Sequence, residues 1–174
     1  IHPEHFDNLI FSIGNGSEVA LLFPYYYAQL VHDGMREMGR DDVLTLSRCA
    51  YLGAQKFGNL VWSGDIPSTF ESLRMQIKSG LNMAMCGIPW WTTDIGGFYG
   101  GDIESDYFRE LIVRWFQFGL FCPVMRLHGS RNGHDRTRDI IEPTGGDNEL
   151  WSFGERNFGI LRDLIFLRER LRPY

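Results

Sequence analysis

Short apolar segments alternate with longer amphipathic ones along this chain of 174 residues. The apolar segments have the length of β-strands and lie at 43–47, 59–62, 86–91 and 122–127. Segments with helical spacing of apolar residues surround them, at 17–38, 70–81, 108–116 and 150–171. Buried parallel strands are apolar throughout, and helices connect them across the faces of their sheet. The order helix-strand-strand-helix-strand-helix-strand-helix therefore predicts an α/β fold with a parallel sheet covered by helices.

Local signals place several helix boundaries. Pro24 predicts a kink or a second helix start within 17–38, and Gly39 predicts the end of that helix. Ser68 and Glu71 have the three-residue spacing of a capping box, which predicts a helix start at this point. The apolar stripe of that helix is Phe70, Leu73, Ile77 and Leu81, and the stripe of the next is Phe108, Leu111, Ile112, Trp115 and Phe116.

The residues that follow the predicted strands favour a barrel over a doubly wound sheet. No G-x-G-x-x-G motif opens a helix, and polar or aromatic residues follow every predicted strand. The carboxyl ends of parallel strands share one edge, so we expect these side chains on one rim. They are Arg48, Trp62 to Asp65, Trp90 to Asp94, and Arg126 with His128. Four strands cannot close an eight-stranded barrel, so we expect about half of one.

Composition argues against several classes of protein. The formal net charge of −5 does not suit a nucleic-acid partner. No run of about 18 apolar residues is present for a membrane span, and the first residues lack a secretion signal. We therefore expect no membrane partner and a cytoplasmic location. Cys49, Cys86 and Cys122 form no C-x-x-C pair, which predicts reduced thiols in the core.

Four longer segments resemble a known enzyme family. They are LSRCAYLGAQKF (46–57), LVWSGD (60–65), GIPWWTTDIGGF (87–98) and FRELIVRWFQFGLFCPVMRLHG (108–129). In this order and at these separations they resemble glycoside hydrolase family 31, the retaining α-glucosidases and α-xylosidases. The resemblance implies a (β/α)₈ TIM-barrel catalytic domain, of which 1–174 is the C-terminal half with strands five to eight and no second domain. It also implies hydrolysis of terminal α-linked xylose or glucose from oligosaccharides, with no cofactor and no metal.

The resemblance makes Asp65 the general acid/base of this reaction. In that role its carboxyl group protonates the departing glycosidic oxygen and later deprotonates water. Asp65 also precedes a predicted helix, so a simpler interpretation is an anion that the helix macrodipole stabilises.

The resemblance also implies a set of sugar-binding residues, each with a structural alternative. Arg48 and His128 align with residues that bind hydroxyl groups of the cleaved sugar, although either could be purely structural. Trp62 and Phe98 resemble the aromatic walls of that subsite, although they could be core. Asp94 could accept hydrogen bonds from a sugar or from Arg48, or could shape the glycine loop in an Asx turn. Trp90 is interpreted as core, and the arginines at 126, 131, 136 and 138 as rim or solvated residues.

One family feature has no counterpart in the sequence. The family nucleophile is an aspartate at the tip of the fourth barrel strand, and no aspartate here follows a suitable strand. We therefore expect the nucleophile in a segment upstream of Ile1, and we expect the N-terminal half of the barrel as a partner besides the glycoside substrate. Two alternatives are a non-catalytic carbohydrate-binding half-barrel and a protein-interaction fragment. Exposed sheet edges would favour self-association of this chain.

Overall fold

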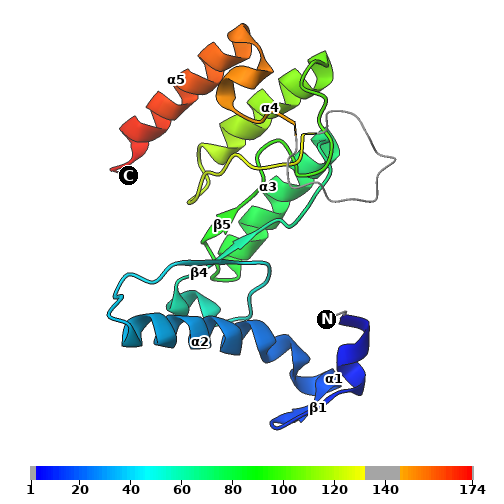
Figure 1. Cartoon of the computed structure of the whole chain (residues 1–174), viewed down its shortest axis with the longest axis vertical. Helices are drawn as coiled ribbons and strands as arrows, with labels where there is room; N and C mark the ends of the chain where they lie inside the picture. The colour runs from blue at the N-terminus through cyan, green and yellow to red at the C-terminus, as the bar shows by residue number, and fades with distance from the viewer. Residues whose placement is uncertain (1–2, 132–145, 174) are drawn as a thin grey trace.

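The computed structural model describes residues 3–131 and 146–173. Its four long helices are α2 (Phe23–Glu37), α3 (Phe70–Met85), α4 (Asp106–Gly119) and α5 (Glu155–Leu171). The chain is elongated, with α2 and the N-terminal segment at one end and α4 with α5 at the other (Figure 1). The strands of the central parallel sheet and α3 lie between these ends (Figure 1). Shorter elements are η1 (Pro3–Asn8), β1 (Ile10–Phe11), β2 (Gly14–Asn15), α1 (Gly16–Val19), η2 (Ala20–Leu22), η3 (Ala54–Phe57) and η4 (Leu150–Phe153).

The central sheet is parallel, as the apolar segments predict. It has the order β3 (Thr45–Ser47), β4 (Asn59–Trp62), β5 (Trp91–Thr92). Leu46 pairs with Leu60, and Val61 pairs with Trp91. A single parallel bridge between Ile95 and Leu127 continues the sheet beyond β5. The carboxyl ends of the strands therefore lie along one edge.

Two predicted strands are much shorter than expected. The segment 86–91 was predicted as a strand, but Cys86 is the C-cap of α3 and Gly87 has a φ of 79°. Proline at 89 also lacks the amide proton that a ladder needs, so β5 includes only Trp91 and Thr92. The late start leaves Trp91 buried and Trp90 47% exposed, so the interpretation of Trp90 as core is wrong.

The predicted strand 122–127 is reduced to the bridge at Leu127. Cys122 still belongs to the turn that ends α4, because its amide donates to the carbonyl oxygen of Gly119 at 3.0 Å. Pro123 follows and has no amide proton to donate. Of the three cysteines, all free, only Cys122 is buried. The prediction of core thiols is therefore correct for Cys122 and wrong for Cys49 and Cys86.

The start of α3 differs from the predicted capping box. Thr69 is the N-cap, and its Oγ1 accepts a hydrogen bond from the amide of Ser72 at 3.0 Å. Ser68 lies before the helix, where its amide donates to the carbonyl oxygen of Tyr99 at 2.9 Å. The capping-box prediction at Ser68 is wrong because this backbone pairing delays the helix by one residue.

The other helices match their predictions, with breaks where the sequence indicates them. Helical structure from Gly16 is interrupted before Pro24, which lies in the first turn of α2. The segment 150–171 is divided into η4 and α5 by Gly154, which has a φ of 88°. Only glycine adopts such a φ without steric cost.

The main core lies between α3, α4 and α5. The apolar stripe predicted for α4 is buried there, together with Phe153 of η4 and Leu161 of α5. Burial of a large apolar side chain contributes about 1.5–3 kcal/mol, so these contacts dominate the stability of this end. The buried members are Leu73, Ile95, Phe108, Leu111, Ile112, Val113, Trp115, Phe116, Phe153 and Leu161.

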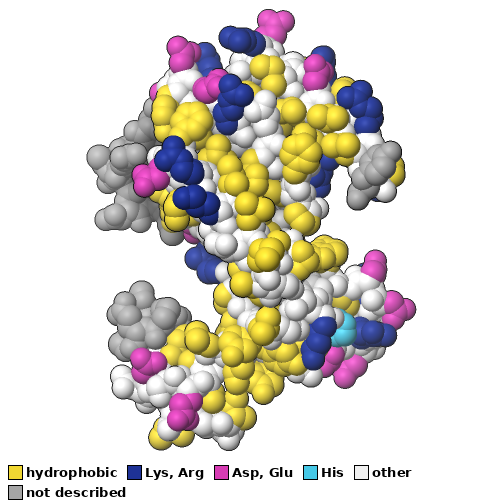
Figure 2. All heavy atoms as spheres, turned by 180° about the vertical axis from the view of Figure 1, so that it is seen from behind, with side chains coloured by type: hydrophobic (Ala, Val, Ile, Leu, Met, Phe, Trp, Pro, Cys, Tyr) yellow, Lys and Arg dark blue, Asp and Glu magenta, His cyan; other side chains and the backbone are white. Residues whose placement is uncertain are grey.

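The end of the molecule around α2 has a smaller core and an apolar surface. Ala28 of α2 packs with Ala54 and Phe57 of η3, and the rings of Tyr25 and Phe57 lie 5.2 Å apart. Hydrophobic side chains also reach the surface over this end and over the narrow middle of the molecule (Figure 2). Exposed examples are Ile10, Leu21, Phe23, Leu30 and Leu52. Contiguous apolar surface of this kind marks an interaction face.

Candidate active site

The predicted site residues come from successive strand ends along one edge of the sheet. Arg48 directly follows β3, and Trp62 ends β4 with Asp65 three residues later. Asp94 and Phe98 lie in the loop after β5. Arg126 and His128 flank Leu127, which bridges to Ile95 of that loop. The topology therefore brings every predicted site residue to the same rim.

Asp65 and Arg48 form an ion pair at this rim. Arg48 Nη2 donates to Asp65 Oδ2 at 3.3 Å. The Asp65 side chain keeps 28% of its surface exposed and that of Arg48 keeps 66%. The Asp65 carboxylate can therefore be reached from solvent while Arg48 holds one of its oxygens.

The Trp62 ring is approached by two guanidinium groups. The Cζ atom of Arg48 lies 5.3 Å from the ring centroid and that of Arg126 lies 6.0 Å from it. Attraction between a guanidinium and an aromatic face is worth about 0.5–1 kcal/mol at exposed sites. Trp62 thus connects the β4 end to both arginines.

Asp94 is the most buried polar side chain of the rim, with no exposed surface. Arg126 Nη2 donates to Asp94 Oδ1. The sequence analysis suggested Arg48 as a donor to Asp94, but the observed donor is Arg126. The other oxygen, Oδ2, has no hydrogen-bond partner among the described residues. Burial raises the pKa of Asp94, and the charge of Asp65 adds to the rise, whereas Arg126, His128 and Arg131 oppose it. A sugar cannot touch this carboxylate in the observed conformation.

Phe98 and His128 form the second part of the rim. Their ring centroids lie 5.5 Å apart with a tilt of 40°. The Phe98 amide donates to the carbonyl oxygen of Ile66 at 2.7 Å, and the Ser130 amide donates to the carbonyl oxygen of Phe98 at 2.8 Å. The backbone at Phe98 therefore links the segment after Asp65 to the segment after His128.

Gly97 makes this close approach possible. It has a φ of 81°, and a Cβ atom at this position would lie 2.6 Å from the Cα of Ser68. Any other residue would push the loop after β5 away from the segment between Asp65 and α3.

Arg131 is buried. The prediction that it lies at the rim or in solvent is therefore wrong. Only 1% of Arg131 is exposed. Its guanidinium group donates to the carbonyl oxygens of Ile95 at 2.8 Å and Gly97 at 2.6 Å, and to Asn148 Oδ1 at 2.8 Å. Burial lowers its pKa to about 10, and the charge of Asp94 opposes that change. Arg136 and Arg138 lie outside the described residues.

The sequence carried one indirect signal for a buried group near Arg131. Gly96, Gly97 and Gly129 cluster around it, and glycine permits backbone to approach another group closely. A Cβ atom at Gly96 would lie 2.6 Å from Arg131 Nη2, and one at Gly129 would lie 2.7 Å from its Cζ.

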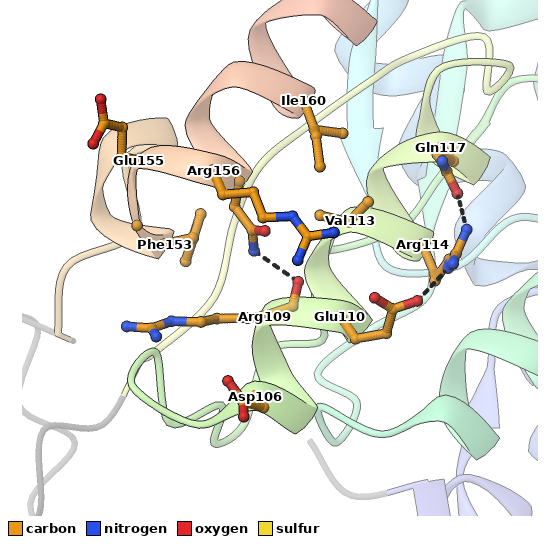
Figure 3. Close-up of a pocket in the computed structure, with 12 residues that line it drawn as sticks. Asp106, Arg109, Glu110, Val113, Arg114, Gln117, Phe153, Glu155, Arg156 and Ile160 are labelled. Carbon is orange, nitrogen blue, oxygen red and sulfur yellow. Dashed lines mark hydrogen bonds and ion pairs between the residues drawn. The ribbon is translucent and has the colours of Figure 1, made fainter.

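A groove of about 610 Å³ lies between α4 and α5, away from this rim (Figure 3). Half of its lining residues are charged, and several lining residues are already engaged in contacts with one another. Arg114 Nε donates to Glu110 Oε1 at 2.6 Å, and Asn157 Nδ2 donates to the carbonyl oxygen of Arg109 at 2.8 Å (Figure 3). None of the rim residues lines this groove.

Within residues 3–131 and 146–173, no three His, Cys, Asp or Glu side chains are grouped so that they could hold a metal ion. No helix in the same ranges is both long and apolar enough to cross a membrane.

Comparison with known proteins gives consistent matches. Residues 4–174 match the model of the glycosyl hydrolases family 31 TIM-barrel domain. An uncharacterized family 31 glucosidase of Pseudescherichia vulneris is 50% identical over 126 residues, which are 72% of this chain and 24% of that protein. An α-xylosidase of Saccharolobus solfataricus is 37% identical over 162 residues, 93% of this chain and 20% of that protein.

A solved structure agrees with these matches. The crystal structure of a family 31 α-xylosidase from a soil metagenome, complexed with xylose, is similar with a TM-score of 0.88 and 50% identity. The similarity covers 97% of this chain and 26% of that protein. The chain thus spans about a quarter or less of the length of these proteins, and it matches part of a larger (β/α)₈ barrel.

Proposed function

Because this chain belongs to the family 31 glycosyl hydrolase TIM-barrel domains, we propose that it forms part of a retaining exo-α-glycosidase. The substrates are oligosaccharides or glycosides with a terminal α-linked xylose or glucose. The observation that carries this proposal is the Asp65 carboxylate, partly exposed and paired with Arg48 at the carboxyl end of β4. Catalytic residues of TIM barrels lie at this face of the barrel.

Asp65 is assigned as the general acid/base. A retaining glycosidase needs two carboxyl groups about 5–5.5 Å apart, one to transfer protons and one to attack the sugar. Arg48 occupies one oxygen of Asp65 at 3.3 Å, so the other oxygen is the one that can face a glycosidic oxygen. The nucleophile is assigned to another strand of the barrel, because the rim described above offers only Asp94 as a second carboxylate and Asp94 has no exposed surface.

The remaining rim residues are assigned to the sugar that the enzyme releases. Arg48 and His128 have hydrogen-bonding groups for its hydroxyls, and Trp62 and Phe98 have apolar faces for its C–H groups. Asp94 is assigned an indirect role, in which it orients the guanidinium of Arg126. The similar α-xylosidase is complexed with xylose, which supports a single pentose or hexose unit as the sugar that is released.

The proposal is tested by hydrolysis in a full-length enzyme that contains this sequence. Wild type is assayed with p-nitrophenyl α-xyloside and α-glucoside, and proton NMR identifies the first anomer released. The α-anomer is expected, because two successive displacements retain configuration. Asp65→Asn should lose most activity, whereas the matched control Asp163→Asn, in an exposed ion pair on α5, should keep it.

Other outcomes would support the alternatives. Sugar binding without turnover would favour a carbohydrate-binding half-barrel, and neither binding nor turnover would favour an interaction fragment. First release of the β-anomer would contradict the retaining mechanism.

A further inference from the structure

Arg131 joins the backbone segments that carry three of the rim residues. Its Nη2 donates to the carbonyl oxygen of Ile95, next to Asp94, at 2.8 Å. Its Nη1 donates to the carbonyl oxygen of Gly97, next to Phe98, at 2.6 Å. Nη2 also reaches the carbonyl oxygen of His128 at 3.4 Å. One planar group therefore holds the chain on both sides of the Phe98–His128 pair.

From these contacts we infer that Arg131 is a positioning residue for the glycosidase reaction, holding Phe98 and His128 in the orientation that binds the released sugar. This inference rests on the proposed function. Arg131 cannot bind the sugar itself, because only 1% of it is exposed. It acts through the two side chains whose backbone it fixes.

The energetics favour a rigid arrangement. Among the described residues Arg131 has no ion-pair partner, so other groups there satisfy its donors, since an unpaired buried charge is very costly. Asn148 Oδ1 accepts from Nε at 2.8 Å and Ser68 Oγ accepts from Nη1 at 3.2 Å. The Phe108 ring lies 4.9 Å from Cζ and covers another side. Movement of either loop would break charge-assisted hydrogen bonds that water could not replace.

The backbone is shaped for a guanidinium group in particular. Gly96 and Gly129 leave the space that Nη2 and Cζ occupy, because a Cβ at either position would come within 2.7 Å of these atoms. A lysine ammonium keeps the charge but places its donors at one point, so it cannot bridge carbonyl oxygens that lie in different directions.

The test uses the full-length enzyme with Arg131→Lys and the matched control Arg162→Lys, whose guanidinium pairs with the adjacent Asp163 at the surface. Arg131→Lys should lower kcat/KM about 10- to 100-fold, because misplacing a binding group by about 1 Å can cost that much. The loss should appear in kcat more than in KM, and Arg162→Lys should match wild type. Circular dichroism at the assay temperature checks that each variant is folded.

A double-mutant cycle separates positioning from simple loss of stability. If Arg131 acts through His128, Arg131→Lys should cost clearly less in a His128→Ala background than in wild type. Equal losses in both backgrounds would overturn the inference. If Arg131→Lys does not fold, Asn148→Ala removes only the acceptor of Nε, and the same comparison is made with that variant.

The outcomes distinguish this inference from the proposed function. A wild-type enzyme with no Asp65-dependent turnover means that the proposed function fails. An active, Asp65-dependent enzyme whose Arg131→Lys variant equals wild type means that only the positioning role fails.

Discussion

Arg126 and Asp94 form an ion pair between residues 32 positions apart, and the carboxylate has no exposed surface. The Arg126 side chain keeps 27% of its surface exposed. The arginine is therefore the member of the pair that can meet a ligand, and the aspartate fixes its direction. This arrangement leads to the first two predictions.

Asp94→Asn should lower kcat/KM of the full-length enzyme while costing little stability. The free energy of unfolding should fall by less than the roughly 3–5 kcal/mol typical of a broken buried ion pair, because Arg126 can turn toward water. Chemical denaturation and steady-state kinetics of the same samples measure both effects. Unchanged kcat/KM would show that the orientation of Arg126 does not matter for turnover.

The pH dependence of that variant has a defined sign. Burial raises the pKa of Asp94 in the folded state above its ordinary value of 3.8. The folded state then binds the proton more tightly than the unfolded state. The stability that protonated Asp94 contributes is therefore fully present below pH 3.8 and is lost as pH rises through the folded pKa. Asparagine does not titrate. As pH rises from about 3.8 through the folded pKa, Asp94→Asn should therefore gain stability relative to wild type, and a relative loss over this rise in pH would contradict the raised pKa.

Asp65→Ala should depend on the leaving group. General acid catalysis is typically worth about 10²–10⁴ in rate, so natural disaccharides should be cleaved far more slowly, whereas aryl glycosides with acidic phenols should suffer less at the first step. Azide should then intercept the glycosyl-enzyme and give an α-glycosyl azide, which NMR identifies. Near wild-type hydrolysis of a disaccharide would remove Asp65 from the acid/base role.

Arg48→Ala and His128→Ala should weaken transition-state binding. Each substitution should lower kcat/KM, and the corresponding loss of transition-state stabilisation should be about 1–3 kcal/mol, through lost hydrogen bonds to the sugar. Melting temperatures should change little for Arg48→Ala, because the Arg48 side chain is 66% exposed. Normal kinetics combined with a clearly lower melting temperature would support a structural role for these residues.

The 174-residue chain alone should be inactive and should self-associate. One accessible carboxylate at the rim cannot form and hydrolyse a covalent intermediate. The three-stranded sheet has open edges, and apolar residues such as Ile10 and Leu30 are exposed, which favours association. Analytical ultracentrifugation and an α-xyloside assay of the pure chain measure both, and Asp65-dependent turnover by the chain alone would contradict this prediction.

Alkylation should separate the cysteines. Cys49 and Cys86 are exposed and should react with iodoacetamide at about pH 8, whereas burial raises the pKa of Cys122 to about 11 and keeps it protonated there. Peptide mass spectrometry over time gives the three rates. Equal rates for Cys122 and Cys86 in the folded protein would contradict the buried environment.

Sequence periodicity was sufficient for the parts of the fold that depend on apolar spacing. The four long helices, strand β4 at Asn59–Trp62 and the parallel order follow from it. The stripe predicted for α3 is only partly correct, because Leu73 is buried but Ile77 and Leu81 are exposed.

Periodicity failed where backbone hydrogen bonds decide the boundary. The Ser68 amide pairs with the carbonyl oxygen of Tyr99 and the helix begins one residue later, after the N-cap Thr69, and Pro89 and Pro123 lack the amide protons that a longer ladder requires.

From the sequence, only those site residues that follow a predicted strand could be placed together. Arg48, Asp65 and His128 follow strands, so the topology places them together without further information. The partner of Asp94 and the burial of Arg131 depend on how the loop after β5 folds against residues near 130, and no local pattern specifies such a contact. The cytoplasmic location and the domain boundary 1–174 stay predictions.

The contact of Gly129 with the Arg131 guanidinium implies a constraint on how this sequence can diverge. A side chain at 129 would need the space of Cζ, which lies 2.7 Å from the added Cβ, so neither position can change alone without leaving an overlap or a buried void. The added Cβ would also lie 2.6 Å from the carbonyl oxygen of Gly97, a backbone atom that a smaller residue at 131 does not move. Among natural variants and in randomised libraries, glycine should therefore be retained at 129 even where residue 131 is smaller.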